Sequence, residues 1–385
     1  MSKKSGSQMK LKKDVLEQSL CTGCGACVGL CPYQIIYRGR TVQLFDCDLQ
    51  DGKCYAFCPR TPANYNEIRK SLFNVDEMTL EIGPVSGYYL SRATDPELRA
   101  KAQHGGTVTA LLELAMAEEI IDSALVSGQN DLLEQEGRLV ETIGALRKYA
   151  KSKFTVSPTV AAFNRLLTDP PRKVGLVATP CQATALARIK TAKLSGDARA
   201  ASPALIIGLL CGWTLAMEKF QNLLKTYQIP IEALCGMDIP PGKNVLELQT
   251  DRVVVSVPMA EVDACVRTAC RYCIDSTAEF ADLSVGAARF GSDFEEMRGW
   301  NQVIVRSRRG HDLIELAREK GVLEIREAPT NALRELKKAA ADKKRKALKA
   351  IVEKSGSVNR LLYLSGDDPV VKKYLDRGQK RKGSS

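Results

Sequence analysis

The sequence predicts an α/β fold built on a mixed β-sheet. Two apolar runs, residues 174–180 and 205–210, are long enough for buried strands, and helical stretches alternate with them. Continuous apolar strands that alternate with helices are typical of parallel or mixed sheets covered on both faces. A third stretch, residues 244–258, has the pattern of a hairpin with its turn near 250–252. These features favour one large α/β unit in the middle of the chain.

Length and composition agree with a globular protein of two or three domains. The chain has 385 residues, of which 44% are hydrophobic and 26% charged. No apolar run reaches membrane-spanning length, and residues 1–20 lack the apolar core of a signal peptide. We therefore expect a cytoplasmic protein with no membrane partner. In that compartment, its 13 cysteines indicate metal ligation rather than disulfides.

The densest cysteine motif lies near the start of the chain, where Cys21, Cys24, Cys27 and Cys31 are followed by Pro32. This is the C-x2-C-x2-C-x3-C-P spacing of bacterial ferredoxins. Thiolates two residues apart can curl around one corner of an iron–sulfur cube, and the intervening glycines allow tight turns. Zinc fits less well, because zinc sites favour two separated cysteine pairs. We predict a ferredoxin-like domain of the 2[4Fe-4S] type over residues 20–60.

The second half of this domain is irregular. A regular motif ending at Cys58 would need cysteines at 48, 51, 54 and 58, but the chain has Cys47, Asp51, Cys54 and Cys58. By the usual cross-over, Cys58 joins the first three cysteines on one cluster. Three thiolates remain for the other, those of Cys31, Cys47 and Cys54. They suit a [3Fe-4S] cluster, or a [4Fe-4S] cluster completed by Asp51 or water. Asp51 is equally well explained as a solvated residue of an Asp-Gly turn.

Further cysteines follow the predicted strands of the larger unit. Cys181 and Cys211 each come directly after a buried strand, and Cys270 and Cys273 form a C-x2-C pair. In an open α/β sheet, the carboxyl ends of parallel strands form the edge where ligands bind. Two cysteines at strand ends could also be core residues, and a C-x2-C pair alone also suits zinc or a redox site. Together the four suit a further iron–sulfur cluster, whereas Cys235 and Cys265 are expected to be ordinary buried residues.

The larger unit also contains the turn Gly105-Gly106, which precedes an apolar-striped helix. Such a turn exposes backbone N–H groups to an anion. Taken alone, a Gly-Gly pair is more often a plain turn than a phosphate site. A short strand is expected at 86–90, another at 123–128, and two closing strands near 281–286 and 302–306.

The net charge of +11 owes much to the C-terminal part of the chain. From Thr330 onward the sequence is helical and rich in lysine, and a solvated helix face is the favoured interpretation. Nucleic acid is one partner that such a charge allows, and an acidic protein surface is another. The lysine-rich stretch has no interleaved aromatic residues to stack on bases, which argues against nucleic acid. Residues 378–385 are expected to be disordered.

Taken together, these stretches resemble the beta subunits of coenzyme F420-reducing hydrogenase and formate dehydrogenase, from Gly87 to about Lys349. The matching segments occur in one order along the chain. They are Ser91-Arg-Ala-Thr-Asp95, Ala102-Gln-His-Gly-Gly-Thr-Val-Thr-Ala-Leu-Leu112, Ser152-Lys-Phe-Thr-Val-Ser-Pro158, Ala178-Thr-Pro-Cys-Gln182, Ile207-Gly-Leu-Leu-Cys211, Met237-Asp-Ile239, Cys270-Arg-Tyr-Cys273 and Ala278-Glu-Phe-Ala-Asp-Leu-Ser-Val-Gly286.

The resemblance implies FAD, at least one [4Fe-4S] cluster and electron transfer between the flavin and a soluble carrier. The implied cluster ligands are Cys181, Cys211, Cys270 and Cys273. The implied flavin-binding residues are Gly105, Gly106, Thr107, Lys153, Thr155, Ser157 and Pro158. His104 departs from the family, which often has an acidic residue before the two glycines. The carrier is accordingly left open between F420, NAD(P)H, a ferredoxin and a partner subunit.

We therefore expect an FAD-dependent oxidoreductase subunit with about three clusters, one of them a candidate [3Fe-4S]. Its partners would be a hydrogenase, a formate dehydrogenase or a heterodisulfide-reductase-like complex. The alternatives are an electron-transfer adaptor without its own carrier site and, less favoured, a nucleic-acid-binding protein. No side chain is predicted to act as a general acid or base. The expected segments are a tail (1–19), the ferredoxin-like domain (20–60), a linker (61–85), the FAD and iron–sulfur domain (86–325) and a basic helical segment (326–385).

Overall fold

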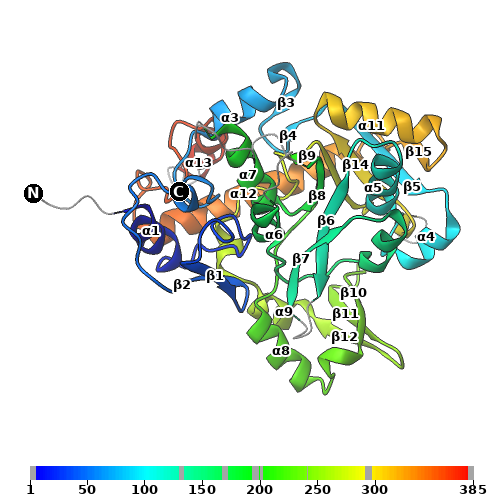
Figure 1. Ribbon diagram of the computed structural model, residues 1–385, viewed down its shortest axis with the longest axis horizontal. Coiled ribbons are helices and arrows are strands. Elements are labelled where there is room, and N and C mark those ends of the chain that lie inside the picture. Colours follow the sequence, from blue (N-terminus) through cyan, green and yellow to red (C-terminus); the bar gives the residue numbers. More distant parts are fainter. Residues whose placement is uncertain are drawn as a thin grey trace, which may run out of the picture.

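A mixed sheet of eight strands forms the centre of the molecule (Figure 1). The computed structural model describes residues 6–129, 134–166, 172–192, 199, 203–240, 242–290 and 297–379. The strand order in the large sheet is β15-β5-β14-β13-β9-β8-β6-β7. The inner strands β13 (Leu283–Ala287), β9 (Pro203–Leu209), β8 (Val174–Ala178) and β6 (Ser123–Gln129) are parallel. The antiparallel outer strands are β5 (Gly87–Ala93), β7 (Gln135–Val140), β14 (Asn301–Val305) and β15 (Leu323–Glu327). The predicted mixed α/β fold is confirmed.

Helices cover both faces of this sheet, which explains why its inner strands are apolar on both sides. On one face, α5 (Thr107–Ala117) and α11 (Arg308–Glu319) share a hydrophobic core with the strands. On the other face, α6 (Thr159–Arg165) and α7 (Pro180–Thr191) do the same. Because β8 and β9 are parallel, their carboxyl ends meet at one edge, as the sequence predicts. That edge receives the segments that follow both strands.

A smaller sheet has its own core and lies at the bottom of Figure 1. Its strands are β10 (Leu234–Asp238), β11 (Val245–Thr250) and β12 (Val254–Pro258), all antiparallel. The predicted hairpin over residues 244–258 is therefore confirmed. Helices α8 (Met217–Thr226) and α9 (Met259–Cys265) contribute to the same core.

The N-terminal region, blue in Figure 1, is small and irregular. It contains α1 (Ser7–Leu11), the π-helical turn η1 (Lys12–Leu16), the hairpin β1 (Gln34–Tyr37) and β2 (Arg40–Gln43), and α2 (Lys53–Ala56). Within the segment expected as a tail, residues 7–16 are helical. Leu11 and Val15 lie one helical turn apart and are buried against Cys27 and Cys58. Their apolar spacing anchors the segment to the cysteine loops.

The segment expected as a linker also packs into the core. Residues 61–85 contain α3 (Tyr65–Leu72), the turn η2 (Val75–Glu77) and the short strands β3 (Met78–Thr79) and β4 (Gly83–Pro84). On α3, Tyr65 and Arg69 are buried. Arg69 donates to Asp368 at 2.9 Å and lies 3.7 Å from Glu279. This segment thus connects the N-terminal region to both the large sheet and the C-terminal helices.

The basic C-terminal segment forms α12 (Ala332–Ser355) and α13 (Pro369–Gln379). The expected solvated face accounts for only part of α12, because Ala347, Leu348 and Ile351 belong to the main core. Lys344 is 1% exposed; it donates to the Ile274 carbonyl at 2.9 Å and pairs with Glu279. Residues 380–385 of the expected disordered end lie outside the described residues.

Among the described residues, none of the helices combines the length and the apolar character needed to traverse a lipid bilayer.

Candidate cofactor site

The first predicted cluster site is the N-terminal set, defined as Cys21, Cys24, Cys27 and Cys58. The loop that carries three of them turns at Gly23 and Gly25, whose φ angles are +73° and +88°. A side chain at either position would overlap backbone atoms of Gly39 or Ala161. The prediction that glycine is needed in this loop is therefore confirmed, for a close packing as well as for the turn.

The thiols of the N-terminal set face one another in the interior. Burial raises the pKa of Cys27, and the neighbouring thiols of Cys58 and Cys21 raise it further. Burial likewise raises the pKa of Cys58 to about 11, although nearby N–H and guanidinium groups oppose it. The hydroxyl of Thr41 lies 3.1 Å from Cys27 Sγ. Buried thiols brought together with a hydrogen-bond donor fit the ligands of an anionic cluster.

A second group, the outer set, consists of Cys31, Cys47 and Cys54. Burial raises the pKa of Cys54, a hydrogen bond from Gln34 lowers it, and the thiols of Cys31 and Cys47 raise it. The structure thus brings the three predicted thiols together despite the displaced position of Cys47. Cys31 and Asp51 are exposed, and Asp51 is not among the groups that influence the thiol of Cys54. The solvated-turn interpretation of Asp51 agrees with this placement.

The third group, the sheet-edge set, is Cys181, Cys211, Cys270 and Cys273. Cys181 lies in the first turn of α7, and the segment Thr179-Pro-Cys-Gln182 forms a capping box. The Thr179 N–H donates to Gln182 Oε1 at 2.8 Å, and the Thr179 hydroxyl lies 3.3 Å from Cys181 Sγ. A thiolate at a helix N-terminus is stabilised by the helix dipole. The motif therefore starts the helix and places the Thr179 hydroxyl beside the thiol of Cys181, whose pKa is raised by burial and lowered by this hydrogen bond.

The other members of the sheet-edge set come from two further segments, one that follows β9 and one that holds both Cys270 and Cys273. Burial raises the pKa of Cys211, whereas Lys343 of α12 lowers it and the thiols of Cys270, Cys181 and Cys273 raise it. The Lys343 ammonium donates to the Cys211 carbonyl at 3.3 Å, and the Thr214 N–H donates to Cys270 Sγ at 3.4 Å. Four cysteines from three separate stretches of the sequence thus meet at the predicted edge of the sheet.

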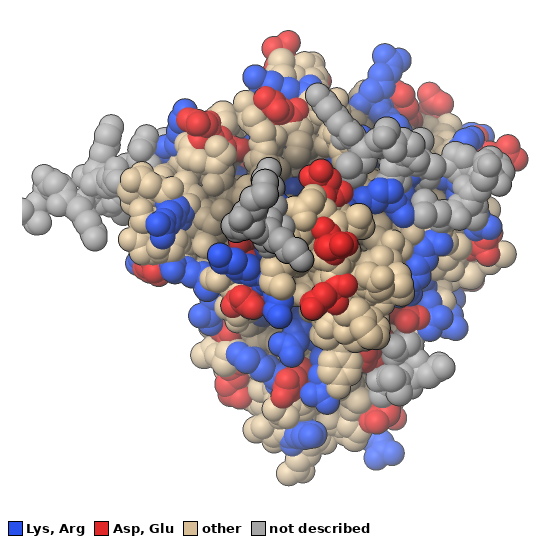
Figure 2. All heavy atoms as spheres, turned by 60° about the vertical axis from the view of Figure 1, so that its left-hand side comes forward, with Lys and Arg blue, Asp and Glu red and all other residues tan. Residues whose placement is uncertain are grey.

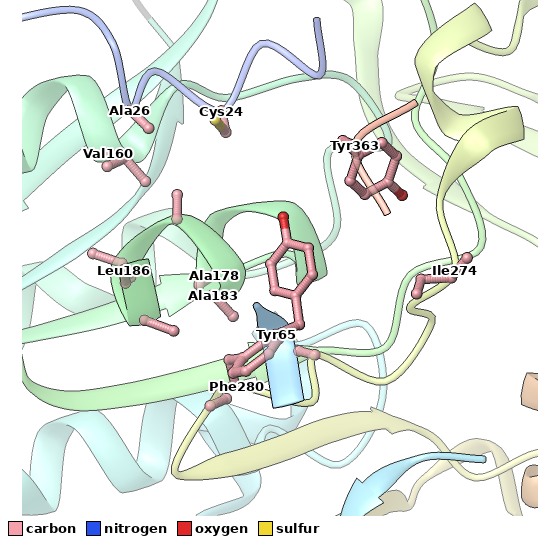
Figure 3. Close-up of a cluster of buried hydrophobic side chains, with 14 of the residues drawn as sticks. Cys24, Ala26, Tyr65, Val160, Ala178, Ala183, Leu186, Ile274, Phe280 and Tyr363 are labelled. Atoms are coloured by element: carbon pink, nitrogen blue, oxygen red, sulfur yellow. The ribbon is translucent and has the colours of Figure 1, made fainter. Parts of the chain in front are cut away.

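The N-terminal and sheet-edge sets are neighbours. Burial raises the pKa of Cys24, and the next contribution comes from Cys181, ahead of Cys58. In Figure 3, Cys24 lies with Tyr65 of α3 and Tyr363 of the C-terminal segment around one part of the core. The two sets were predicted separately, and their proximity is not visible in the sequence. It follows from the packing of Gly25 against Ala161.

No three Cys, His, Asp or Glu side chains within the described ranges converge closely enough to hold a single metal ion. Thiolates on an iron–sulfur cube bind different iron atoms, so they stand further apart than the ligands of one ion. The free thiols, their grouping and the hydrogen bonds to sulfur fit clusters in the three sets.

The two segments implied in flavin binding lie side by side near the same edge. The Ser152 N–H donates to Gln103 Oε1 at 2.8 Å, which joins the segment 152–158 to the Gly-Gly loop. Gln182 of α7 donates to the Ser157 carbonyl at 2.5 Å. Burial lowers the pKa of Lys153, which has no carboxylate within 4 Å among the described residues. A half-buried ammonium without an acidic partner, close to the N-terminus of α5, fits an anionic group such as a pyrophosphate.

The remaining implied flavin residues make contacts within the chain. The Thr107 hydroxyl lies 2.7 Å from the Ser91 hydroxyl, and the Thr107 N–H donates to Asn301 at 3.2 Å. Thr155 is buried, and Pro158 is the residue before α6. A side chain at Gly105 would lie 2.8 Å from the Ser91 carbonyl oxygen, and one at Gly106 would overlap Leu98. The packing of the protein therefore explains why both positions are glycine, and their contact with the flavin stays a prediction.

This packing changes what a substitution at Gly106 should do. Gly106 has φ +77° at the N-cap of α5, so Gly106→Val adds left-handed strain to the overlap with Leu98. We expect the free energy of unfolding to fall by about 2–4 kcal/mol, measured by denaturant unfolding. Gly144→Ala is the control, because nothing lies within 4 Å of its added methyl group. Equal stability of Gly106→Val and the wild type would leave the flavin phosphate as the better reason for this glycine.

His104 lies beside a small group of charged residues at the same edge. Its Nε2 is 4.0 Å from buried Asp238, which also has Arg289 and Arg298 at 3.9 Å. Burial lowers the pKa of His104, although Asp238 opposes this. Gln103 donates to Asp238 at 2.9 Å. His104, the residue that departs from the family pattern, is thus part of a connected group of polar side chains next to the Gly-Gly loop.

The two cysteines left outside the sets differ from each other. Cys265 is buried as expected, but Cys235 is exposed, because its side of β10 faces away from the small core. Residues that the sequence did not single out include Gln34, Thr41, Thr214 and Lys343. They are common polar types whose role depends on the fold, so no spacing signal marks them.

Comparison with known proteins agrees with this geometry. The models of the N- and C-terminal parts of the coenzyme F420 hydrogenase/dehydrogenase beta subunit match residues 88–164 and 171–331, and a 4Fe-4S binding domain matches residues 15–37. The coenzyme F420 hydrogenase subunit beta of Methanothermobacter thermautotrophicus is 32% identical over 68% of this chain and 92% of its own.

Two further proteins span similar lengths. The coenzyme F420 hydrogenase subunit beta of Methanococcus voltae is 29% identical over 69% of this chain and 93% of its own. In fold, the chain resembles a chain of the F420-reducing [NiFe] hydrogenase complex of Methanosarcina barkeri. The TM-score is 0.64 at 22% identity, covering 72% of this chain and 95% of that one. By these matches, the protein belongs to the family of coenzyme F420 hydrogenase/dehydrogenase beta subunits and carries an N-terminal 4Fe-4S domain.

Proposed function

We propose that this protein is an FAD-dependent iron–sulfur oxidoreductase subunit. It passes electrons between a soluble two-electron carrier and a partner subunit. The observation that carries the proposal is the arrangement of the three cysteine sets. The sheet-edge set adjoins the N-terminal set through Cys181 and Cys24, and the outer set reaches the surface at Cys31. Clusters in these three sets would provide a route for electrons from the edge of the sheet to the surface of the protein.

The residues of the chain divide into those for a flavin and those for clusters. FAD, when bound, exchanges two electrons with a carrier and single electrons with clusters. Lys153 and the N-terminus of α5 would hold its phosphates, together with Gly105, Gly106, Thr155, Ser157 and Pro158. The three cysteine sets would each hold a cluster, the outer one as [3Fe-4S] or [4Fe-4S]. Buried surroundings and hydrogen bonds to sulfur would set the potentials of those clusters.

The names of the relatives point to the carrier and to the partner. The family includes subunits of coenzyme F420 hydrogenase and of F420-dependent formate dehydrogenase. F420 is therefore the first candidate carrier, with NAD(P)H the second because His104 departs from the family pattern. The partner would be a hydrogenase, a formate dehydrogenase or a heterodisulfide-reductase-like complex.

The surface near the outer set suits a docked protein. Several large apolar side chains of residues 33–49 are exposed, including Tyr33, Phe45 and Leu49. The rings of Tyr33 and Phe45 are 6.2 Å apart, so these two belong to one surface. Clustered exposed apolar groups mark interaction surfaces. We place the partner on this side, where the outer cluster would exchange electrons with it.

Two other functions can be separated from this one by experiment. A nucleic-acid-binding role is not favoured, because basic and acidic side chains are interspersed on the face in Figure 2 rather than merged into one basic area. An electron-transfer adaptor would have the same clusters but no flavin. The absorbance spectrum of anaerobically purified protein, with FAD and iron analysis, distinguishes these functions. We expect bound FAD and roughly twelve irons per chain. Full iron without flavin would favour the adaptor.

A further inference from the structure

A buried cation, Arg60, lies near cysteines of both the N-terminal and the sheet-edge sets and is 4% exposed. It follows Cys58-Pro59 at the end of the ferredoxin-like loops. Its guanidinium donates to the carbonyls of Tyr272 at 3.1 Å and Ala269 at 3.3 Å, and it contacts the Tyr363 hydroxyl. The guanidinium carbon also lies 4.5 Å from the centre of the Tyr363 ring. All of these partners are neutral.

The charge of Arg60 has no acidic partner within the described part of the chain. No carboxylate lies within 4 Å of it there, and its Nε has no hydrogen-bond partner. Arg69, nearby on α3, is by contrast paired with Asp368 at 2.9 Å. A buried charge without a counter-charge is expensive, so an arginine in this position requires negative charge from another source.

Cysteine sulfurs are the groups that can supply this charge. A cavity of about 30 Å³ is lined by Arg60 together with Cys181, Cys273 and Tyr363. Asp275 and Glu279 also line it, but the carboxylate of each has other partners. Glu279 pairs with Lys344, and Asp275 accepts hydrogen bonds from the N–H groups of Thr277 and Glu279. An arginine guanidinium keeps its proton even when it is buried, so Arg60 carries its positive charge beside these cysteine sulfurs. Cys58 of the N-terminal set lies two residues before Arg60 in the chain, and the Arg60 backbone N–H hydrogen-bonds to its sulfur. Arg60 thus lies near thiols of both sets.

Arg306 is a buried arginine of this protein that does not lie beside cysteine thiols. It too donates to carbonyl oxygens, those of Ile82, Pro84 and Thr277. Burial lowers the pKa of Arg306 to about 10, although Asp275 and Glu279 oppose it, and no thiol contributes. Arg60 differs because its surroundings include the sulfurs of the two predicted clusters.

We propose that Arg60 is a shared counter-cation that raises the reduction potentials of the clusters in the N-terminal and sheet-edge sets. The inference rests on the proposed function, since it requires clusters in both sets. Each cluster gains one negative charge when it accepts an electron. A fixed positive charge in a medium of low dielectric constant stabilises that charge, and net charge near a cluster is a known determinant of its potential. Arg60 would therefore make both clusters easier to reduce and keep their potentials close together.

The test is a redox titration of the anaerobic full-length protein, followed by electron paramagnetic resonance. Arg60→Met keeps most of the side-chain volume and removes the charge, so both midpoint potentials should become more negative. Arg60→Lys retains the charge, so its potentials should stay nearer to those of the wild type. Arg306→Met is the matched control for a buried arginine, and it should move the potentials less than Arg60→Met does.

The outcomes separate this inference from the function on which it rests. If the wild type shows no signals from either set, both are overturned. Wild-type signals together with unchanged potentials in Arg60→Met would overturn the role of Arg60 alone. If Arg60→Met loses iron, its potentials cannot be compared with those of the wild type, and the iron content and potentials of Arg60→Lys then test the role of Arg60. Full iron in Arg60→Lys, with potentials near those of the wild type, supports the counter-cation. Potentials in Arg60→Lys well below those of both the wild type and Arg306→Met, or a loss of iron equal to that of Arg60→Met, contradict it.

Discussion

Cys270→Ala is expected to remove the cluster of the sheet-edge set and to cut the iron content by about a third. It should also stop a soluble carrier from reducing the N-terminal clusters. The two sets lie near each other at the same core, so losing the sheet-edge cluster breaks the proposed route. Flavin should remain, because the segments implied in binding it do not include Cys270. Iron analysis, flavin analysis and electron paramagnetic resonance after carrier addition measure the three effects.

Cys265→Ala is the matched control for that substitution. Cys265 lies close to Cys270 in the sequence, is buried in the core of the small sheet and contacts the Lys219 carbonyl at 3.6 Å. Its replacement should leave the iron content unchanged. If Cys270→Ala keeps all its iron, the sheet-edge set is wrongly assigned. If both variants lose iron equally, the loss reflects damage to the fold.

Lys344→Met is expected to lower the free energy of unfolding by about 3–5 kcal/mol, the usual cost of breaking a buried ion pair. Within the described ranges, the substitution leaves buried Glu279 with only the more distant Arg69, 3.7 Å away, as a cationic partner. It also removes the hydrogen bond to the Ile274 carbonyl next to Cys273. Denaturant unfolding under anaerobic conditions measures the change.

Lys346, exposed on the same helix, provides the control. Lys346→Met should change stability by no more than about 0.5 kcal/mol. The double variant Lys344→Met/Glu279→Leu should recover much of the loss, because it removes the carboxylate that would otherwise be unpaired. A single Lys344→Met variant as stable as the Lys346 variant would mean that the pair contributes nothing.

The sequence predicts those parts of the fold and of the site that depend on local spacing. The strands before Cys181 and Cys211 follow from their apolar runs, and the turn at Gly23 follows from the cysteine motif. The capping box at Thr179 and Gln182 is equally local. The irregular outer set could also be predicted from the sequence. Once Cys58 is grouped with the first three cysteines of the motif, Cys31, Cys47 and Cys54 are the cysteines of the domain that remain.

Contacts between segments distant in sequence could not be predicted. Lys344 and Glu279 are 65 residues apart, and within its own helix Lys344 looks like any solvated lysine. The proximity of Cys24 and Cys181 depends on how the N-terminal loop packs on α6. At Gly106 the sequence suggested one explanation, a turn that binds phosphate. The structure adds a second, because a side chain at this position would overlap Leu98.

The most direct test of the proposed function is reduction of the anaerobic wild-type protein by a set of two-electron carriers. Reduced F420, NADH and NADPH would be added separately while flavin absorbance and cluster resonance signals are recorded, with dithionite as the reference. We expect at least one carrier to bleach the flavin and then to produce the cluster signals. If dithionite reduces intact clusters and every two-electron carrier fails, the protein has no carrier site of its own and the proposal is contradicted.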